Sequence, residues 1–451
     1  MPRRRGGKIV EFKLPIKLDR SIIALGAEFD TRLAFYYNGE VIFSDNIGEL
    51  AEDEERYEEF AREFTAKTLK TSPPPQRRGN KKPNVIITDS HPLYTSRKVG
   101  ERLAKELGIE HIEAQHHIAH VFSAAGDWML NTKYIILNTA FYGIACDGTG
   151  YGFDGNIWGG EVFKVGNLFP TLQRGIKGDF SMGRRMELDN TKRDGNAREK
   201  IPPALPATSS GQALWKRGEI QRIGHLEEQC LLGGELAVEE PARMLISILS
   251  KFLPKDEVFE YMKEYYSKNE FNLLWNQLQQ KFNCMVSSSA GRVLDAVSIL
   301  LGFCENKRKY KHYPVKMLEE SSKPVSSMLQ PIIYRNKTGK YILSTTELFK
   351  YLTENLGADK SQLGYIAQRY IIEGLHEIVK RYDGAKQESD SLRESDSATY
   401  PKIFFSGGLS ANRVMKEFAE EHGIYVSAKI PPGDEGIALG QIVYSIITPS
   451  A

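Results

Sequence analysis

Gln115-His116-His117-Ile118-Ala119-His120 is the stretch of this chain that says most about its fold and chemistry. It places His116 and His120 at positions i and i+4, so their imidazoles project from the same face of a helix. Two imidazoles at this spacing are a standard way to present two nitrogen ligands to one divalent metal. His117 points about 100° away on the helix, which suggests a supporting catalytic role. The spacing alone is equally compatible with a structural or exposed pair of histidines.

A glycine-rich segment, Asp147-Gly148-Thr149-Gly150-Tyr151-Gly152, follows a predicted strand further along the chain. Glycines in a turn let backbone N–H groups approach phosphate oxygens closely, so Gly148, Thr149 and Gly150 are predicted to bind a nucleotide. Asp147 ends the strand, where the carboxyl ends of strands open onto a cleft. A metal and a phosphate cradle close in sequence suggest nucleotide or acyl-phosphate chemistry.

The strands and helices around these motifs follow one repeated order. Alternating apolar residues predict three antiparallel strands between Ser21 and Asp45. Helices and strands then alternate over residues 51–70, 85–88, 94–107, 111–113 and 116–126, in the order βββαβαβα. The order recurs with strands at 134–145, 157–163, 171–173, 402–405 and 424–427, a helix at 411–422 and a last helix from near Glu435. We therefore predict an α/β protein with two duplicated lobes around a central cleft.

Domain boundaries follow from this pattern and from local composition. Residues 1–20 are basic and proline-containing, and are predicted to be a leader or the remnant of an interdomain linker. The N-terminal lobe is expected to cover residues 21–132 and the C-terminal lobe residues 133–451. The second lobe is predicted to contain a polar insertion at 176–222 and a helical subdomain at 240–380.

Two turns in the second half carry further candidates. Ser406-Gly407-Gly408, followed by Asn412, has a strand–turn–helix form in which Gly407 and Gly408 admit a phosphate or ribose to the helix N-terminus. Asp434, in Pro431-Pro432-Gly433-Asp434-Glu435-Gly436, stands at the start of a helix. It is a candidate carboxylate ligand, and the alternative role at this position is an N-cap.

One helix start and one loop complete the set of candidate residues. Serines before Gly291-Arg292 predict a capped helix, and Ser289, Gly291 and Arg292 could face a nucleotide. A buried helix with Arg292 and Asp295 as a local pair explains the same pattern. His91 follows a strand and could orient a substrate, while a local hydrogen bond in its loop is an equal alternative.

Composition limits the classes of function. The chain has 60 Lys and Arg residues against 58 Asp and Glu, a net charge of +2, which gives no global electrostatic case for nucleic acid. Cys146, Cys230, Cys284 and Cys304 form no C-x-x-C pair, so we predict reduced thiols, without a zinc ribbon or a disulfide framework. The sequence has no long apolar run and no secretory signal, which predicts a cytoplasmic protein without a membrane anchor.

These motifs together resemble the C-terminal catalytic domain of the HypF family of hydrogenase-maturation carbamoyltransferases, which is related to the tRNA threonylcarbamoyl-transferase subunit. The series runs in the family's order across about residues 21–446, and an ordered series is far more specific than any one motif. The matching segments are residues 24–28, 90–92, 115–120, 147–152, 157–161, 232–235 with 240–241, 288–292, 406–408 and 431–434.

The resemblance implies a fold, a set of cofactors and a reaction. The fold is that of actin-like ATPases, the class of actin, heat-shock proteins and sugar kinases. His116, His120, Asp147 and Asp434 would hold a divalent metal (iron, zinc or magnesium), with ATP, AMP or carbamoyl-adenylate between the lobes. The implied reaction is carbamoyl transfer from carbamoyl-adenylate to the C-terminal cysteine of the partner protein HypE, on the way to the cyanide ligands of NiFe hydrogenases.

The resemblance also assigns Gly159 and Gly160 to the nucleotide, and it shows departures. Where the family has Gly-Gly-Asp, this chain has Gly233-Gly234-Glu235, which puts Glu235 in doubt. The insertion at 176–222 is longer than the family leads us to expect. In the family, acylphosphatase, zinc-finger and adenylate-forming domains precede this one. The Arg-rich start of the present chain therefore predicts a separate partner chain that carries them.

Two other classes of function remain open. The same chemistry could serve another acceptor, such as a small-molecule hydroxyl or a tRNA adenosine. The chain could also be a non-catalytic, nucleotide-binding assembly subunit, although the presence of all four candidate ligands argues against a degenerate site. A sugar kinase of the same fold would not need the histidine pair.

Overall fold

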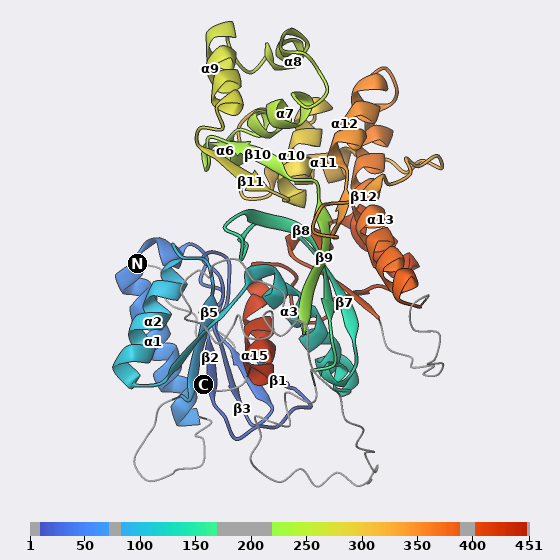
Figure 1. Ribbon diagram of the computed structural model, residues 1–451. Helices are drawn as coiled ribbons and strands as arrows, with labels where there is room; N and C mark the ends of the chain where they lie inside the picture. The colour runs from blue at the N-terminus through green and yellow to red at the C-terminus, as the bar shows by residue number, and fades with distance from the viewer. Residues whose placement is uncertain (1–9, 72–82, 169–218, 388–401, 449–451) are drawn as a thin grey trace, which may run out of the picture.

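The computed structural model describes residues 10–71, 83–168, 219–387 and 402–448 (Figure 1). The predicted strand at 171–173 and most of the predicted insertion at 176–222 lie outside these ranges. The last residues of that predicted insertion, from Ile220 onward, begin strand β9.

The first sheet has six strands in the order β1-β4-β3-β2-β5-β6. β2, β3 and β4 form an antiparallel meander, and β5 and β6 continue the sheet parallel to β2. This confirms the three predicted antiparallel strands. β1, which lies inside the predicted leader, pairs with β4. The bounds are Val10–Lys13 (β1), Ile22–Ala24 (β2), Ala34–Tyr37 (β3), Glu40–Phe43 (β4), Val85–Asp89 (β5) and Glu110–Ala114 (β6).

The second sheet repeats this topology. Its segment β9-β8-β7-β14-β15 has the same order as β4-β3-β2-β5-β6, with β7, β8 and β9 antiparallel and β14 and β15 parallel to β7. β13 and β12 extend the sheet beyond β9. The predicted duplication is therefore present in the strand order. The bounds are Phe141–Tyr151 (β7), Ile157–Val165 (β8), Ile220–Leu226 (β9), Ile333–Arg335 (β12), Tyr341–Leu343 (β13), Ile403–Ser406 (β14) and Tyr425–Val426 (β15).

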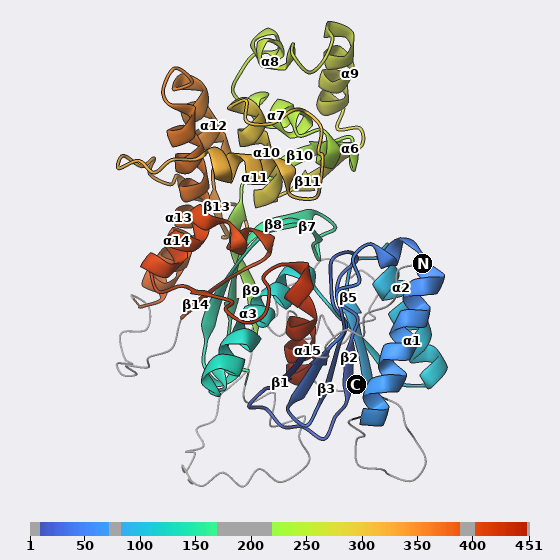
Figure 2. The same ribbon diagram turned by 180° about the vertical axis from the view of Figure 1, so that it is seen from behind.

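Two helices lie between the sheets and position the candidate site. α3 (His116–Thr132) and α15 (Ile437–Ile447) pack on each other, and their apolar residues share one core with residues of both sheets (Figures 1 and 2). α1 (Glu54–Thr71) and α2 (Thr95–Leu107) cover the opposite face of the first sheet. Each sheet is thus buried by helices, which is the layered arrangement expected of an α/β protein.

A largely helical region stands at one end of the second sheet (Figure 1). α13 continues down along β8, β9 and β13, and α14 follows β14. Among the described helices, none is long and apolar enough to span a lipid bilayer. The bounds are Leu236–Glu239 (α6), Ala242–Leu249 (α7), Lys255–Met262 (α8), Lys268–Gln279 (α9), Ala290–Leu300 (α10), Tyr313–Ser321 (α11), Thr345–Glu354 (α12), Lys360–Gln387 (α13) and Arg413–Glu421 (α14).

Two local predictions in the second lobe are wrong. The strand expected from residue 134 begins only at Phe141, after the short 3-10 helix η2 (Ile136–Asn138). The glycine-rich loop expected at 147–152 is instead the second half of β7, apart from Gly152, which follows the strand. The ladder with β8 is interrupted between Cys146 and Gly150 and then resumes. The glycines therefore sit in an irregular strand rather than in a free phosphate-binding turn.

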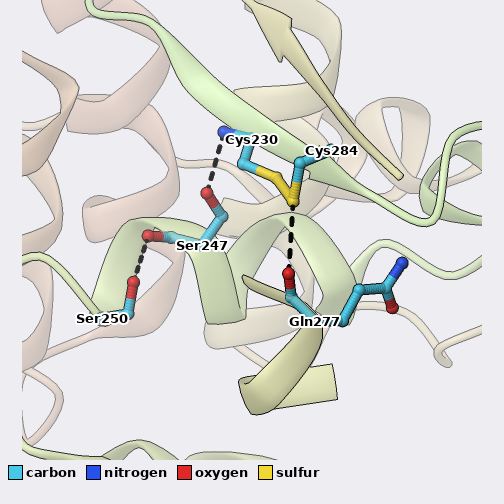
Figure 3. Close-up of a disulfide and its surroundings, with 5 residues drawn as sticks. All are labelled: Cys230, Ser247, Ser250, Gln277 and Cys284. Atoms are coloured by element: carbon cyan, nitrogen blue, oxygen red, sulfur yellow. Dashed lines mark hydrogen bonds between the residues drawn. A yellow bond between two sulfur atoms is a disulfide. The ribbon is translucent and has the colours of Figure 1, made fainter. Parts of the chain in front are cut away.

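The prediction of four reduced cysteines is also wrong. Cys230 on β10 (Gln229–Leu232) and Cys284 on β11 (Cys284–Ser287) form a disulfide with Cα atoms 5.4 Å apart (Figure 3), whereas Cys146 and Cys304 are free. Cys230 stands opposite Val286 in the antiparallel ribbon, so the two cysteines are diagonal neighbours. They are 54 residues apart in sequence, and no known spacing motif predicts a disulfide between two such cysteines.

Removing this disulfide by Cys284→Ser should lower the free energy of unfolding by up to about 4 kcal/mol, because a long loop of the unfolded chain is no longer closed. Thermal unfolding with and without a reducing agent measures the effect. The variant should be insensitive to the reductant, and Cys304→Ser should keep the sensitivity of the wild type. A wild-type melting temperature that the reductant leaves unchanged would contradict the prediction.

Candidate metal centre and anion site

Four side chains from three separate segments meet at the start of α3. They are His116 and His120 on α3, Asp147 on β7 and Asp434 at the start of the 3-10 helix η4 (Asp434–Gly436), and each offers a ligand atom within 4.8 Å of the others. His116 Nε2 lies 3.1 Å from His120 Nε2 and 3.1 Å from Asp147 Oδ2. Asp434 Oδ1 is 3.5 Å from both imidazole nitrogens. The structure thus brings together the four residues predicted as metal ligands.

The donor set fits a divalent cation. Asp434 Oδ1 is buried and has no hydrogen-bond partner, and the Nε2 atoms of both imidazoles point at each other and at this oxygen. A cation between them would satisfy both nitrogens and the orphaned oxygen. Two carboxylates also balance the charge of one divalent ion. Two nitrogen and two oxygen donors suit zinc or iron.

His116 is held in place by a carboxylate behind it. Its Nδ1 lies 2.7 Å from Asp89 Oδ2, and both side chains are buried. Such a carboxylate fixes the ring orientation and directs Nε2 toward a metal. Burial alone would lower the pKa of His116, but Asp89 and Asp147 outweigh burial and raise the pKa well above its usual value. Burial alone would raise the pKa of Asp147, but the imidazoles of His116 and His120 outweigh burial and hold this pKa well below its usual range.

The start of α3 is fixed to β7 by Gln115. Gln115 is the N-cap of α3, because its side-chain oxygen accepts a hydrogen bond from the N–H of Ile118. The side-chain amide nitrogen of Gln115 donates to the carbonyl of Tyr151. Gly150 lies beneath the imidazoles, and a Cβ there would come within 2.4 Å of the His117 ring. Gly150 therefore makes room for the histidines rather than for a phosphate.

Asp434 does not cap α15, so the alternative role considered from the sequence is wrong. Gly436 occupies that N-cap position. Gly433 has a φ of +79°, a conformation that glycine adopts without strain, and it turns the chain into η4. The Asp434 carboxylate then faces α3, and Lys311 Nζ lies 3.2 Å from its other oxygen.

Ser289, Gly291 and Arg292 form a tight contact with β7. Ser289 caps α10 by accepting from the N–H of Arg292, and its hydroxyl donates to the carbonyl of Gly148. A Cβ on Gly291 would lie 2.9 Å from the Gly148 Cα, so glycine is required for this approach. Thr149, the remaining residue of the predicted phosphate cradle, lies half-buried in the interrupted part of β7.

Arg292 is buried beside Gly148 and keeps unused donors. It pairs with Asp295 at 3.0 Å, as the structural alternative predicted, and Arg308 stands 3.7 Å from the same carboxylate. Nη1 of Arg292 faces Asp295 in this pair, whereas Nε of Arg292 and Nε of Arg308 are buried without hydrogen-bond partners. Two guanidinium groups against one carboxylate leave a net positive charge. This arrangement suits an anion.

The turn after β14 lies next to Asp147, and Gly407, Gly408 and Asn412 have different structural roles there. Gly407 has a φ of +85°, and a Cβ there would lie 2.3 Å from the Cys146 carbonyl, so packing against β7 requires it. Gly408 donates its N–H to Asp147 Oδ1 at 3.3 Å and is otherwise uncrowded. Asn412 caps α14 and donates to Gln368, so its side chain is already used in the structure.

Gly159 and Gly160 are packing residues around a buried ion pair. Their N–H groups donate to Glu161, whose other oxygen accepts from Arg222 Nε at 2.5 Å, and the Arg222 guanidinium stacks on Trp158. Burial alone would raise the pKa of Glu161, but the charge of Arg222 outweighs it and lowers the pKa to about 2. The Ser288 hydroxyl also donates to Glu161, which ties this pair to the start of α10.

Glu161→Gln should lower the free energy of unfolding by about 3 kcal/mol at neutral pH, because the buried Arg222 loses its closer counter-ion and keeps only Asp154, 3.4 Å from its Nη1. The folded pKa lies below the usual 4.5, so the contribution is present above pH 4.5 and is lost as the pH falls toward 2. Denaturant unfolding from pH 7 to pH 2 should show wild type and variant converging. Glu260→Gln, at an exposed pair with Lys263, serves as the control and should behave like wild type throughout. A constant difference at all pH values would contradict the prediction.

The two residues predicted as catalytic lie near the cluster in different settings. His91 is half-buried, stacks on Tyr94 at 4.1 Å between ring centroids, and accepts a local hydrogen bond from the N–H of Leu93. His117 is fully buried, and its Nε2 has no partner. Burial lowers the pKa of His117 to about 3, so this ring is neutral.

Three charged residues of the site were not predicted from the sequence. Asp89 ends the parallel strand β5, and a carboxylate at the carboxyl end of a parallel strand is a signal that could have found it. Arg308 and Lys311 lie between α10 and α11, in a run of basic residues typical of a solvated loop. No sequence pattern distinguishes them from such a loop.

Two family models match the chain. The one described as "Carbamoyltransferase, Kae1-like Domain, second subdomain" matches residues 143–174 and 213–441. The one described as "HypF Kae1-like domain" matches residues 17–127. All four candidate metal ligands fall within these ranges. The resemblance seen in the sequence motifs is confirmed.

Individual relatives agree with the family models. The chain is 31% identical to the probable carbamoyltransferase HypF of Methanocaldococcus jannaschii over 99% of this chain and 49% of that protein. A crystal structure of T. kodakarensis HypF matches with a TM-score of 0.71 and 27% identity, over 99% of this chain and 50% of that one. A full-length HypF in a phosphate- and nucleotide-bound form matches in fold with a TM-score of 0.68 and 22% identity, over 97% and 56%. The actin-like fold is thereby confirmed, and the chain spans about half the length of the curated relative.

Proposed function

This chain belongs to the HypF family of carbamoyltransferases, and we propose that it transfers a carbamoyl group from carbamoyl-adenylate to an acceptor at a divalent metal held by His116, His120, Asp147 and Asp434. The observation that carries this proposal is the convergence of these four ligand atoms within 4.8 Å, with one carboxylate oxygen left without a partner.

The chain's own residues would prepare the site for this reaction. Bound there, a divalent ion would polarise the carbamoyl carbonyl or neutralise the phosphate. Asp89 orients His116, and Gly408 fixes the second oxygen of Asp147, so the ligands are in place before substrate enters. In the transfer step the bond from the carbamoyl carbon to the phosphate oxygen breaks, AMP leaves with the electron pair, and the acceptor atom forms the new bond to carbon.

We place the phosphate of the adenylate beside Arg292 and Arg308. Their unused guanidinium nitrogens are buried, and Arg292 reaches Gly148, the neighbour of the metal ligand Asp147. An anion there would complete the hydrogen bonding of both arginines. This placement adds Arg308 to the residues inferred from the sequence, and it reassigns Gly150, Gly159, Gly160, Gly407 and Asn412 to packing and capping.

We propose the thiol of the C-terminal cysteine of a HypE partner as the acceptor, in the synthesis of the cyanide ligands of NiFe hydrogenases. Family membership supports this choice. A thiolate is a strong nucleophile that attacks a polarised carbonyl readily.

The test is mass spectrometry of candidate acceptors after incubation with the metal-loaded protein and enzymatically made carbamoyl-adenylate. A mass increase of one carbamoyl group on the HypE cysteine is the expected result. The increase should disappear in the Asp147→Asn variant. Modification of a tRNA or a small-molecule hydroxyl instead would support carbamoyl transfer by this protein but would show that the HypE cysteine is not the acceptor. No modification of any acceptor by the metal-loaded protein would overturn the function.

Gly408→Leu should weaken the binding of AMP by about tenfold or more without unfolding the protein, because its side chain would extend beside Asp147. Isothermal titration calorimetry measures the affinity. Gly357→Leu is the matched control, since a Cβ there meets nothing within 4 Å, and its affinity should equal that of wild type. Equal affinities in wild type and both variants would show that the nucleotide does not bind on this side of Asp147.

A further inference from the structure

A polar stripe runs along one face of α3, beyond the two candidate metal ligands. His116, His120, Ser123 and Asp127 are spaced four, three and four residues apart, which places them on one side of the helix. Ser123 donates its hydroxyl to the carbonyl of Gly436 at 2.8 Å. The whole stripe therefore faces the segment that leads from β15 through η4 into α15.

The Asp127 carboxylate accepts hydrogen bonds from the backbone of this segment. Its Oδ1 accepts hydrogen bonds from the N–H groups of Lys429 at 3.0 Å and Ile430 at 2.7 Å. Its Oδ2 accepts from the N–H of Ala428 at 2.8 Å and the hydroxyl of Tyr425 at 2.7 Å. The carboxylate is fully buried. Three consecutive backbone N–H groups thus converge on one carboxylate.

Only an ionised carboxylate can satisfy this arrangement. Every neighbouring group named above donates, so the residue at position 127 needs two acceptor oxygens and no donor. An asparagine would point its own amide hydrogens at N–H or O–H donors. The anchor is therefore specific to aspartate, and replacing it leaves buried N–H groups without partners.

The anchored backbone ends four residues before a candidate metal ligand. Pro431, Pro432 and Gly433 connect Ile430 to Asp434, and the two prolines restrict the backbone of the connection. From the other side, the Thr31 hydroxyl donates to the Asp434 carbonyl at 2.8 Å, and Arg32 pairs with the neighbouring Glu435. The position of the Asp434 carboxylate is thus fixed at both ends of a short, stiff segment.

We propose that Asp127 is a positioning residue for carbamoyl transfer: it holds residues 428–430 so that Asp434 reaches the metal beside His116 and His120. The proposal rests on the proposed function. Helix α3 then supplies two metal ligands directly, and through the Asp127 carboxylate it also positions a third ligand, Asp434. Asp127 touches neither metal nor substrate, so its effect passes entirely through Asp434.

A double-mutant cycle on zinc affinity tests this, with zinc titrated into the full chain. Asp127→Asn should weaken zinc binding by about 10- to 100-fold, as outer-shell changes do. In an Asp434→Ala background the same change should have no further effect, because the ligand it positions is gone. Tyr425→Phe removes one donor to Asp127 but keeps the three backbone bonds, so its affinity should stay near that of wild type.

A merely structural Asp127 predicts a different outcome, in which stability falls but zinc affinity is unchanged or falls equally in both backgrounds. Either result would overturn the proposal. If Asp127→Asn does not fold, amide exchange of the unmodified protein decides: zinc should slow exchange at Ala428, Lys429 and Ile430, and unchanged exchange would refute the coupling. A wild type that binds no zinc, iron or magnesium would refute the proposed metal site itself, and the positioning role with it.

Discussion

Replacing both His116 and His120 by alanine is expected to reduce the divalent metal content from about one ion per chain to near zero. The variant loses both nitrogen ligands, and two carboxylates alone hold zinc or iron far more weakly in competition with water. Asp89 would also lose the imidazole that it orients. Metal content of the purified, reloaded protein, measured by elemental mass spectrometry, gives the result directly.

A second histidine pair provides the matched control. His376 and His422 have ring centroids 5.4 Å apart in α13 and next to α14, yet neither belongs to the four-residue cluster. The double variant His376→Ala with His422→Ala should retain the full metal content. Full occupancy in the His116 and His120 double variant would exclude the proposed centre, whatever the control shows.

Gly440→Ala should lower the free energy of unfolding by about 3 kcal/mol or more, the upper range for overpacking a core. A Cβ at this position would lie 1.7 Å from the carbonyl oxygen of Ala119 and 2.7 Å from the backbone nitrogen of Ser123. Both are backbone atoms of α3, so relief requires α15 and α3 to move apart. Because His120 and Asp434 belong to the two separated segments, metal affinity should fall as well.

Denaturant unfolding and zinc titration of the same samples measure the two effects. Gly384→Ala, in the exposed end of α13 where a Cβ meets nothing within 4 Å, is the control. It should be more stable than wild type by up to about 1 kcal/mol, since alanine favours a helix over glycine. A Gly440→Ala variant within about 0.5 kcal/mol of wild type would show that α3 and α15 are not in the backbone contact described.

The parts of the site that the sequence predicted are those set by local periodicity. The spacing of His116 and His120 fixes their common face on any helix, and the duplicated order of strands and helices sets the two sheets. Asp147 and Asp434 stand beside glycine-rich segments that drew attention to them, and the family resemblance then implied that both are metal ligands. The structure brings these four residues together although they come from three segments of the chain.

The parts that sequence could not give depend on contacts between distant segments. Gly159 and Gly407 resemble phosphate-binding glycines, but each is required by a neighbouring backbone, at Asp147 and Cys146 respectively. Glycine serves close approach to a ligand and to another strand equally well, so only the packing distinguishes the two roles. Arg308 becomes a candidate only because the fold buries it beside Arg292, and Cys230 meets Cys284 only through the pairing of β10 with β11.

Anomalous diffraction from crystals of the zinc-loaded protein, recorded at the zinc absorption edge, tests the central claim most directly. One strong peak is expected within about 2.0–2.2 Å of His116 Nε2, His120 Nε2 and a carboxylate oxygen each of Asp147 and Asp434. Asp89 should remain bonded to His116 Nδ1, outside the coordination sphere. A zinc ion held by other residues, or no peak at this position in fully loaded crystals, would show that these four residues do not form the metal site.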